Sequence, residues 1–237
     1  MILNMGIIGL GFVGSSVQHG FCKNVDITIV DPKYTENTID RLVDFNPQLI
    51  FICVPTPSLE DGDIDVSIVE SVIRELNSFH YGGVVVIKST IIPSHVKRLK
   101  DSTDLRIVYN PEFLTEANAH EDFCNPPMQI LGGEWHDTEE VERAYVQFSR
   151  VKIVPTFKTD IETASMIKYT INSWLATKVM FMNELRDVFE ASGASTPWDD
   201  FTHMLSHDTR IGHSHMQVPG PDGHKGFGGH CFPKDTE

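Results

Sequence analysis

The sequence predicts an α/β protein, with a doubly wound parallel β-sheet followed by an α-helical domain built on one long helix. Three observations support this prediction. Short β-branched runs alternate with helical segments through the first half of the chain. The glycine-rich stretch GLGFVG directly follows the first of these runs. After residue 156 the alternation ends, and residues 160–192 contain neither glycine nor proline. We therefore expect two domains, 1–156 and 157–237.

The predicted strands are short, apolar and bounded by Gly, Pro, Asn or Asp, as buried parallel strands are. They cover residues 5–10, 26–31, 48–54, 83–89 and 105–110, with two edge strands at 128–133 and 151–156. Helices are expected over 66–79, where apolar residues recur at helical spacing, and over 137–149.

The segment 160–192 predicts a single long helix, with Asp160 as its N-cap and Gly193 as its stop. Its apolar residues cover more than one face, which is typical of a helix that packs into a core or against another subunit. The Gly-, Pro- and His-rich stretch 211–229 is interpreted as an ordered loop.

Composition restricts the possible partners. The chain carries 19 Lys and Arg against 33 Asp and Glu, a formal net charge of -14, which argues against a nucleic-acid binder. No apolar run reaches the ~18–20 residues of a membrane helix, and the N-terminus lacks the features of a signal peptide. The cysteines have no CxxC spacing, so we expect reduced thiols and a cytoplasmic protein.

The cysteines other than Cys231 and the clustered histidines could have other roles. Cys22, Cys53 and Cys124 are interpreted as small buried hydrophobic residues. Several histidines crowd the last part of the chain, and two pairs have a spacing that could bind a metal. These pairs are His203 with His207 and His213 with His215. We interpret them as polar loop residues and expect no metal site.

The GLGFVG stretch has the spacing of a dinucleotide fingerprint, because Gly9, Gly11 and Gly14 follow a predicted strand and open a helix. The first glycine makes the tight turn, the second lets a pyrophosphate approach, and the third lets helix and strand pack closely. Asp31 ends the second strand, where a carboxylate binds the adenosine ribose and favours NAD over NADP. Lys33 is a nearby cofactor contact that weakens this preference. The pattern predicts a Rossmann-like domain.

Thr56 and Thr90 follow the carboxyl ends of two predicted strands, the edge at which open parallel sheets bind ligands. The alternative is local turn chemistry. The predicted cofactor contacts extend to the neighbouring residues of these three segments, namely Phe12, Val13, Val54, Pro55 and Ser89.

Cys231 is the strongest candidate for chemistry. Three residues, Gly228 to His230, precede it, and Pro233 follows at a position favoured in the first turn of a helix. A helix N-terminus and the nearby Lys234 would both lower the pKa of the thiol, as in a nucleophile. The alternative is a small core residue.

Two further groups could act on a substrate. Lys168 and Asn172 share one face of the long helix and could stabilise an oxyanion, although a snorkelling lysine beside an incidental amide is the alternative. Glu112 and Glu116 follow a strand, where they could do acid–base work or be ordinary acids at a helix start.

Taken together, the motifs resemble those of the UDP-glucose/GDP-mannose dehydrogenase family. GLGFVG, FICVPTP, IKST, NPEFLTE, IKYTIN, NEL, DTRIG and GFGGHCFPKD occur in the order of that family. The resemblance implies two successive NAD-dependent oxidations of a sugar C6 alcohol to a uronic acid. DTRIG and CFPKD look more like the branch that converts UDP-glucose to UDP-glucuronate, with GDP-mannose and UDP-N-acetylhexosamines as alternatives.

The resemblance also implies roles. Cys231 would be the nucleophile, passing through a thiohemiacetal and a thioester, while Lys168 and Asn172 stabilise the oxyanions. Asp235 would activate water held by Thr90, and Glu112 would be the acid or base in hydrolysis. Glu116 and Lys234 would lie near the cofactor. Arg210 would reach the sugar in the partner of a homodimer formed through the long helix. The remaining predicted substrate contacts are Phe113, Leu114, Phe227 and Gly228.

The sequence departs from the family in two places. Only a short stretch separates Asp31 from Val54, so a strand or loop on the adenine side is expected to be trimmed. The family also continues into a nucleotide-sugar-binding domain beyond residue 237, so the chain is expected to be a fragment, a minimal form or partner-dependent. The alternatives from other classes are a non-catalytic NAD-binding dimerisation module and a β-hydroxyacid dehydrogenase, which would have no use for Cys231.

Overall fold

The computed structural model describes residues 2–60, 62–228 and 231–236, without the side chains of Glu116 and Cys231. The chain forms two compact units, residues 1–168 and 169–237. The boundary between them falls inside the long helix, α7 (Ile161–Ala191). Among the described residues, no helix has the length and apolar character needed to cross a membrane.

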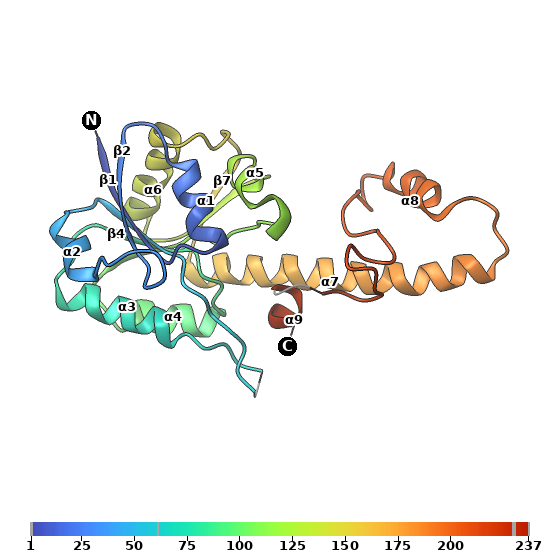
Figure 1. Ribbon diagram of the computed structural model, residues 1–237, viewed down its shortest axis with the longest axis horizontal. Coiled ribbons are helices and arrows are strands. Elements are labelled where there is room, and N and C mark those ends of the chain that lie inside the picture. Colours follow the sequence, from blue (N-terminus) through green and yellow to red (C-terminus); the bar gives the residue numbers. More distant parts are fainter. Residues whose placement is uncertain (1, 61, 229–230, 237) are drawn as a thin grey trace. The chain divides into compact units, whose positions relative to one another are not determined.

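The first unit alternates strands and helices, which confirms the predicted α/β class (Figure 1). Its strands are β1 (Leu3–Ile8), β2 (Val25–Val30), β3 (Leu49–Ile52), β4 (Val84–Ile87), β5 (Arg106–Tyr109), β6 (Gln129–Gly133) and β7 (Thr156–Thr159). Its helices are α1 (Phe12–Gly20), α2 (Ile39–Asp44), α3 (Ser67–Ser78), α4 (Pro93–Asp101), α5 (Ala119–Cys124) and α6 (Trp135–Phe148), with a 3₁₀ turn at Glu116–Asn118.

The described strands form one sheet in the order β2-β1-β3-β4-β5-β6-β7. Neighbouring strands are parallel, except that β6 runs antiparallel to β5. Strand β2 lies at the edge, with no described strand outside it, as expected from the short stretch after Asp31. Because every residue of β3 and β4 is buried, these central strands read as continuous apolar runs in the sequence.

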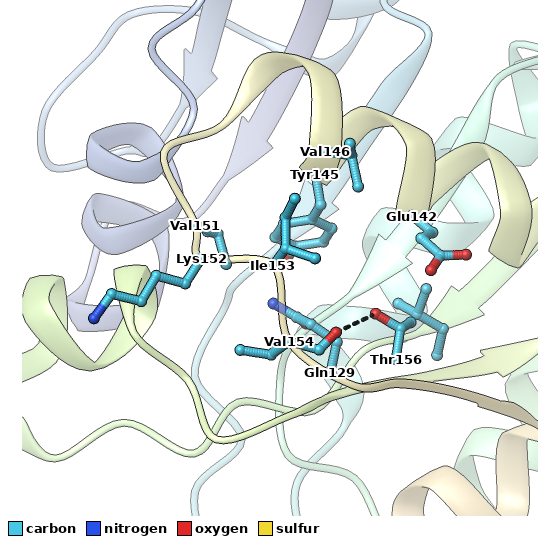
Figure 2. A pocket seen from close by; sticks show the side chains of 10 residues that line it. Gln129, Glu142, Tyr145, Val146, Val151, Lys152, Ile153, Val154 and Thr156 are labelled. Atoms are coloured by element: carbon cyan, nitrogen blue, oxygen red, sulfur yellow. Dashed lines mark hydrogen bonds between the residues drawn. The ribbon is translucent and has the colours of Figure 1, made fainter.

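The predicted edge strand at 151–156 is wrong, because the strand in this region is β7 (Thr156–Thr159). Residues 151–155 have no regular structure. Pro155 has no N–H to donate to a ladder, and Ile153 is 87% exposed rather than packed in the core. The apolar run here lines a shallow surface pocket between α6 and β6 (Figure 2).

Helices cover both faces of the sheet, with α1, α5 and α6 over one face and α3 and α4 against the other (Figure 1). The core under α1, α5 and α6 is built from inward-facing strand residues and three aromatic side chains. These are Phe21, Phe123 and Tyr145, whose rings pack at 5.0 Å and 6.2 Å between centroids. This packing joins the end of α1, the helix that follows the glycine turn, to α5 and α6.

The long helix is confirmed, and so are both of its predicted ends. Asp160 accepts a hydrogen bond from the backbone N–H of Thr163 at 2.7 Å, and Gly193 adopts a φ of +74°. The second unit adds α8 (Trp198–Ser206) and the short α9 (Cys231–Thr236). Its own small core comprises Met182, Trp198, Met216 and Val218. Residues 207–228 form no helix or strand, as predicted for most of this stretch.

The prediction for the cysteines is only partly right. Cys53 is buried, but Cys22 is exposed and Cys124 is half-buried. Cys22 follows the end of α1, where its sulfur accepts a hydrogen bond from Nε of Arg150 at 3.2 Å, so it lies at a polar surface rather than in the core.

Candidate functional site

The three glycines of the turn between β1 and α1 meet different constraints. Gly9 has a φ of +90°, and a Cβ there would lie 2.7 Å from the carbonyl oxygen of Cys53. A Cβ on Gly14 would lie 1.9 Å from the carbonyl oxygen of Gly9. A Cβ on Gly11, by contrast, would meet no described atom within 4 Å. The protein itself requires Gly9 and Gly14, whereas the space at Gly11 is left for a ligand.

The N-terminus of α1 suits an anion. Gly11 is the N-cap and supplies no side-chain cap, so the first backbone N–H groups of α1 keep their donor capacity. Phe12 is 59% exposed beside them, while Val13 packs against the core. An open approach and uncapped amides are what the pyrophosphate of a dinucleotide needs, so these residues fit NAD.

Asp31 lies beside this turn. Its Oδ2 accepts a hydrogen bond from the backbone N–H of Leu10 at 2.7 Å, and its Oδ1 accepts one from the N–H of Lys33 at 2.8 Å. A carboxylate has further lone pairs, so Asp31 can bind ribose hydroxyls while it holds the turn. The Lys33 ammonium lies over the ring of Tyr34, 5.2 Å from its centroid.

The residues after β3 and β4 are joined at the same edge of the sheet. Thr56 is buried, and its hydroxyl donates to the backbone oxygen of Thr90 at 2.8 Å. The Ser89 hydroxyl donates to the backbone oxygen of Val54 at 2.7 Å. Both hydroxyls therefore crosslink the two strand ends, and the bond of Thr56 is a long-range one rather than a local cap. Pro55 is exposed.

Glu112 follows β5 and is held from two sides. Its Oε1 accepts a hydrogen bond from Nζ of Lys168 at 3.0 Å, and its Oε2 accepts one from the backbone N–H of Leu114 at 2.6 Å. Lys168 is 2% exposed and lies 5.5 Å from the ring centroid of Phe113. The snorkelling interpretation of Lys168 is therefore wrong, because its ammonium is buried and paired.

Sequence reasoning missed Lys88, which directly precedes Ser89. The side chain is 3% exposed, and burial lowers its pKa from the ordinary 10.5 to about 8. Burial also raises the pKa of the Cys53 thiol to about 12. A lysine directly after an apolar strand was the signal, since a buried lysine must find polar partners.

In the second unit, Asn172 and Asp235 are paired. The amide nitrogen of Asn172 donates to Oδ2 of Asp235 at 2.5 Å, and Lys234 forms an ion pair with the same carboxylate. Both members of the amide–carboxylate pair are buried. This bond fixes α9, which begins at Cys231, against α7.

The other predicted residues of the second unit are less constrained. Arg210 is exposed and pairs with Asp208 at 2.5 Å. The ring of Phe227 packs edge-on against Phe232, with 6.2 Å between centroids, and Gly228 is exposed. The predicted roles of the Cys231 and Glu116 side chains lie outside what the structure describes. Among the described residues, no group of three or more His, Cys, Asp or Glu side chains is arranged to hold a metal ion.

The fold and these groups define a class: proteins that bind a dinucleotide at the carboxyl edge of a doubly wound sheet. The chain matches the NAD binding domain of the UDP-glucose/GDP-mannose dehydrogenase family over residues 37–149 and the central domain of the same family over residues 162–237. The chain therefore belongs to the UDP-glucose/GDP-mannose dehydrogenase family, whose NAD binding domain indicates NAD as the cofactor.

Individual relatives agree with this assignment. The chain is 35% identical over 196 residues to the UDP-glucose 6-dehydrogenase of Rickettsia felis, covering 80% of this chain and 42% of that protein. It is 32% identical over 208 residues to the GDP-mannose 6-dehydrogenase of Pseudomonas syringae pv. tomato, covering 79% and 44%. The chain thus spans less than half the length of these curated relatives.

A solved structure shows the same fold. It is that of a UDP-glucose dehydrogenase from the hyperthermophilic archaeon Pyrobaculum islandicum, with a TM-score of 0.78 and 25% identity. The match covers 100% of this chain and 62% of that one. This structural match includes the glycine turn and Asp31, which precede residue 37, the first residue matched to the NAD binding domain of the family.

Proposed function

We propose that this chain carries the NAD-binding and catalytic residues of a dehydrogenase that oxidises C6 of a nucleotide sugar twice, converting UDP-glucose to UDP-glucuronate. The observation that carries the proposal is the bond between Asn172 and Asp235. It fixes the helix that begins at Cys231 against a helix whose amide can donate to an oxyanion.

The proposed chemistry divides into capture and hydrolysis. The glycine turn and Asp31 would hold NAD, which would supply the hydride acceptor for each oxidation. Cys231 adds as a thiolate to the C6 aldehyde and forms a thiohemiacetal, whose oxidation gives a thioester. Water then attacks the thioester carbonyl, so the C–S bond breaks, the thiol is released and C6 becomes a carboxylate. The captured aldehyde cannot diffuse away between the two oxidations.

The other residues take supporting roles. Lys168 and Asn172 donate to the oxyanions, and Asp235 and Thr90 hold the attacking water. Glu112, paired with Lys168 at 3.0 Å, moves the proton of that water. Glu116 and Lys234 contact the cofactor, and Phe113, Leu114, Phe227 and Gly228 shape the sugar site. Because the nucleophile is a free thiol, a reducing compartment such as the cytoplasm is part of the proposal.

We also propose that the chain works as a homodimer formed through α7, with Arg210 reaching the sugar bound by the partner. Five large apolar side chains of α7 are exposed, and three of them follow one another at intervals of seven residues, namely Trp174, Phe181 and Val188 at 66%, 62% and 65%. Such a stripe is expected at a subunit interface. Arg210 is itself 87% exposed, so a partner can approach it although it pairs with Asp208 within the chain.

A steady-state assay tests the proposal. The purified chain is mixed with NAD and UDP-glucose, GDP-mannose or UDP-N-acetylmannosamine, and NADH absorbance is followed beside a Cys231→Ala variant. The expected result is two NADH per UDP-glucose, lost in the variant. NAD binding without NADH from any sugar would refute catalysis by this chain and favour a non-catalytic NAD-binding module.

A further inference from the structure

Lys88 belongs to the IKST motif and occupies a central place at the sheet edge, but the proposed chemistry gives it no role. It directly follows β4, and the parallel register extends past the strand ends. Lys88 N donates to the backbone oxygen of Ile52, and Asn110 N donates to that of Ile87. Lys88 therefore stands in the row that links the ends of β3, β4 and β5.

The ammonium of Lys88 lies 5.7 Å from the ring centroid of Phe123, and both of its described hydrogen bonds go to Asn110. Its Nζ donates to the backbone oxygen of Asn110 at 3.1 Å and to the side-chain oxygen Oδ1 of the same residue at 2.9 Å. Hydrogen bonds from a charged donor in a buried place are stronger than neutral ones. The two bonds together fix both the backbone and the χ angles of Asn110.

Asn110 is also bound by β6, which flanks β5 on the side away from β4, and by α6. Its Nδ2 donates to the backbone oxygen of Ile130 in β6 at 2.8 Å, and the hydroxyl of Tyr145 donates to its Oδ1 at 2.7 Å. Three separate elements therefore converge on this one amide. Such a fully satisfied buried network defines a single position for the chain.

That position lies at the base of the loop that carries Glu112. Only Pro111, whose ring fixes φ, separates Asn110 from Glu112. Beyond it, the Glu112 carboxylate accepts from the Leu114 amide at 2.6 Å and from Lys168 at 3.0 Å. The loop is thus anchored at its base by Lys88 and closed at its tip by Glu112. Lys88, Glu112, Phe113 and Leu114 line one small pocket.

We propose that Lys88 is a positioning residue for Glu112, which clamps Asn110 so that the Glu112 carboxylate keeps one orientation toward Lys168. The proposal rests on the proposed function, in which Glu112 moves a proton. It deepens that function by adding a residue that need not touch the substrate.

The charges around Lys88 are compatible with this role. Cys53 after β3, Glu112 after β5, and Lys168 on α7 all interact electrostatically with the ammonium, while Tyr145 of α6 binds the same amide oxygen. Glu112 is the one carboxylate in this set, and it lies between two lysines. Removing Lys88 therefore deprives the loop of both its clamp and one of two neighbouring positive charges.

The experiment compares four versions of the 237-residue chain: wild type, Lys88→Met, Tyr145→Phe and Lys100→Met. Lys100 is the matched control, because it also donates to a backbone oxygen, that of Leu105 at 3.3 Å, in the same unit. Hydrogen exchange at the Leu114 amide reports whether the Glu112 carboxylate still holds its place. Turnover of UDP-glucose with NAD is measured in parallel.

In Lys88→Met, Leu114 protection is expected to fall about tenfold and kcat by a similar factor, with the KM for NAD unchanged. Tyr145→Phe, which removes one neutral bond to the same amide, is expected to show a smaller loss in both. Lys100→Met is expected to match the wild type. If Lys88→Met does not fold, Tyr145→Phe alone decides the proposal by its effect on Leu114.

Unchanged protection of Leu114 in a folded Lys88→Met chain, or an equal loss in Lys100→Met, would overturn the proposal. If the wild type forms no NADH, the proposed function fails, and the exchange measurement still decides whether Lys88 orients Glu112. The two failures are therefore distinguishable.

Discussion

The sheet edge after β3 and β4 in the first unit and the surroundings of α9 in the second unit hold their polar groups by different means. In the first unit, Thr56, Ser89 and Lys88 donate to backbone oxygens of adjoining strand ends. In the second unit, Asn172, Asp235 and Lys234 are held by one another's side chains. A sheet edge is fixed by the ladder beneath it, whereas a loop and a short helix depend on a few side-chain pairs. The first unit is thus preorganised, and the second is the part that substitutions loosen most easily.

The largest loss of stability is expected at Gly14, where the glycine turn leaves no room for a side chain. Gly14→Ala would place a Cβ 1.9 Å from the carbonyl oxygen of Gly9, so the backbone must move. We expect a loss of about 3 kcal/mol or more in the free energy of unfolding, together with loss of NAD binding. Thermal unfolding and calorimetric titration with NAD measure the two effects.

Gly11→Ala is the matched control, because its Cβ would meet no described atom within 4 Å. We expect its stability to stay near that of the wild type while NAD binds more weakly. Equal destabilisation of both variants would show that the turn is not preorganised as described.

The second unit is expected to unfold separately from the first. Trp198 is the largest side chain of its small core, and Trp198→Ala should cost about 3–5 kcal/mol. Because the sheet has its own core, we expect exchange protection to be lost in residues 169–228 and retained in the strands. Trp135, which is 67% exposed, supplies the control, and Trp135→Ala should cost under about 1 kcal/mol. A uniform loss of protection in Trp198→Ala would contradict this division.

The sequence could predict the features that neighbouring residues determine, but not the contacts between residues far apart in the chain. The glycine turn, Asp31 and the apolar strands were predictable because neighbouring residues in the chain determine them. The clamp of Lys88 on Asn110 was not, since the two residues are 22 positions apart and meet only through the pairing of β4 with β5. The last strand is Thr156–Thr159 rather than 151–156, because residues such as Ile153 are exposed. The apolar pattern of a sequence does not show whether its residues are exposed.

The pairing of Asn172 with Asp235 was anticipated as a shared site, but not as a direct bond. The two residues are 63 positions apart, and residues 207–228, which lead from α8 toward Asp235, have no periodicity that predicts a contact. The exposed position of Cys22 was missed for a similar reason, because its partner Arg150 is distant in the chain.

A pH titration sharpens the account of the buried lysine. The pKa of Lys88 is lowered from 10.5 to about 8 by burial, so the folded state binds fewer protons than the unfolded state between these values. The cost of burying the ammonium is present below about pH 8 and is relieved as the pH rises toward 10.5. Relative to Lys88→Met, the wild type should therefore gain stability over this interval, as measured by denaturant titration. If the difference in free energy of unfolding between the wild type and Lys88→Met stays constant from pH 7 to 10, the buried ammonium is refuted.

The smallest effect is expected at the start of α7. The Asp160 carboxylate accepts from the backbone N–H of Thr163, and this bond holds its pKa below the ordinary 3.8. The cap is present above that value and is lost as the pH falls through the lowered pKa. Asp160→Ala should lower the free energy of unfolding by about 1 kcal/mol at neutral pH. In strong acid it should not lower it, because the wild type has then lost the same cap. Urea titrations at the two pH values measure the difference, and an equal cost at both would exclude a charged cap.

The central claim is that Cys231 holds the sugar covalently between the two oxidations. The most direct measurement is rapid acid quenching of the chain with NAD and UDP-glucose, followed by peptide mass analysis. We predict an adduct with the mass of the oxidised nucleotide sugar on the peptide that contains Cys231, formed only when NAD is present. NADH formation without any adduct, or an adduct on another residue, would contradict the account.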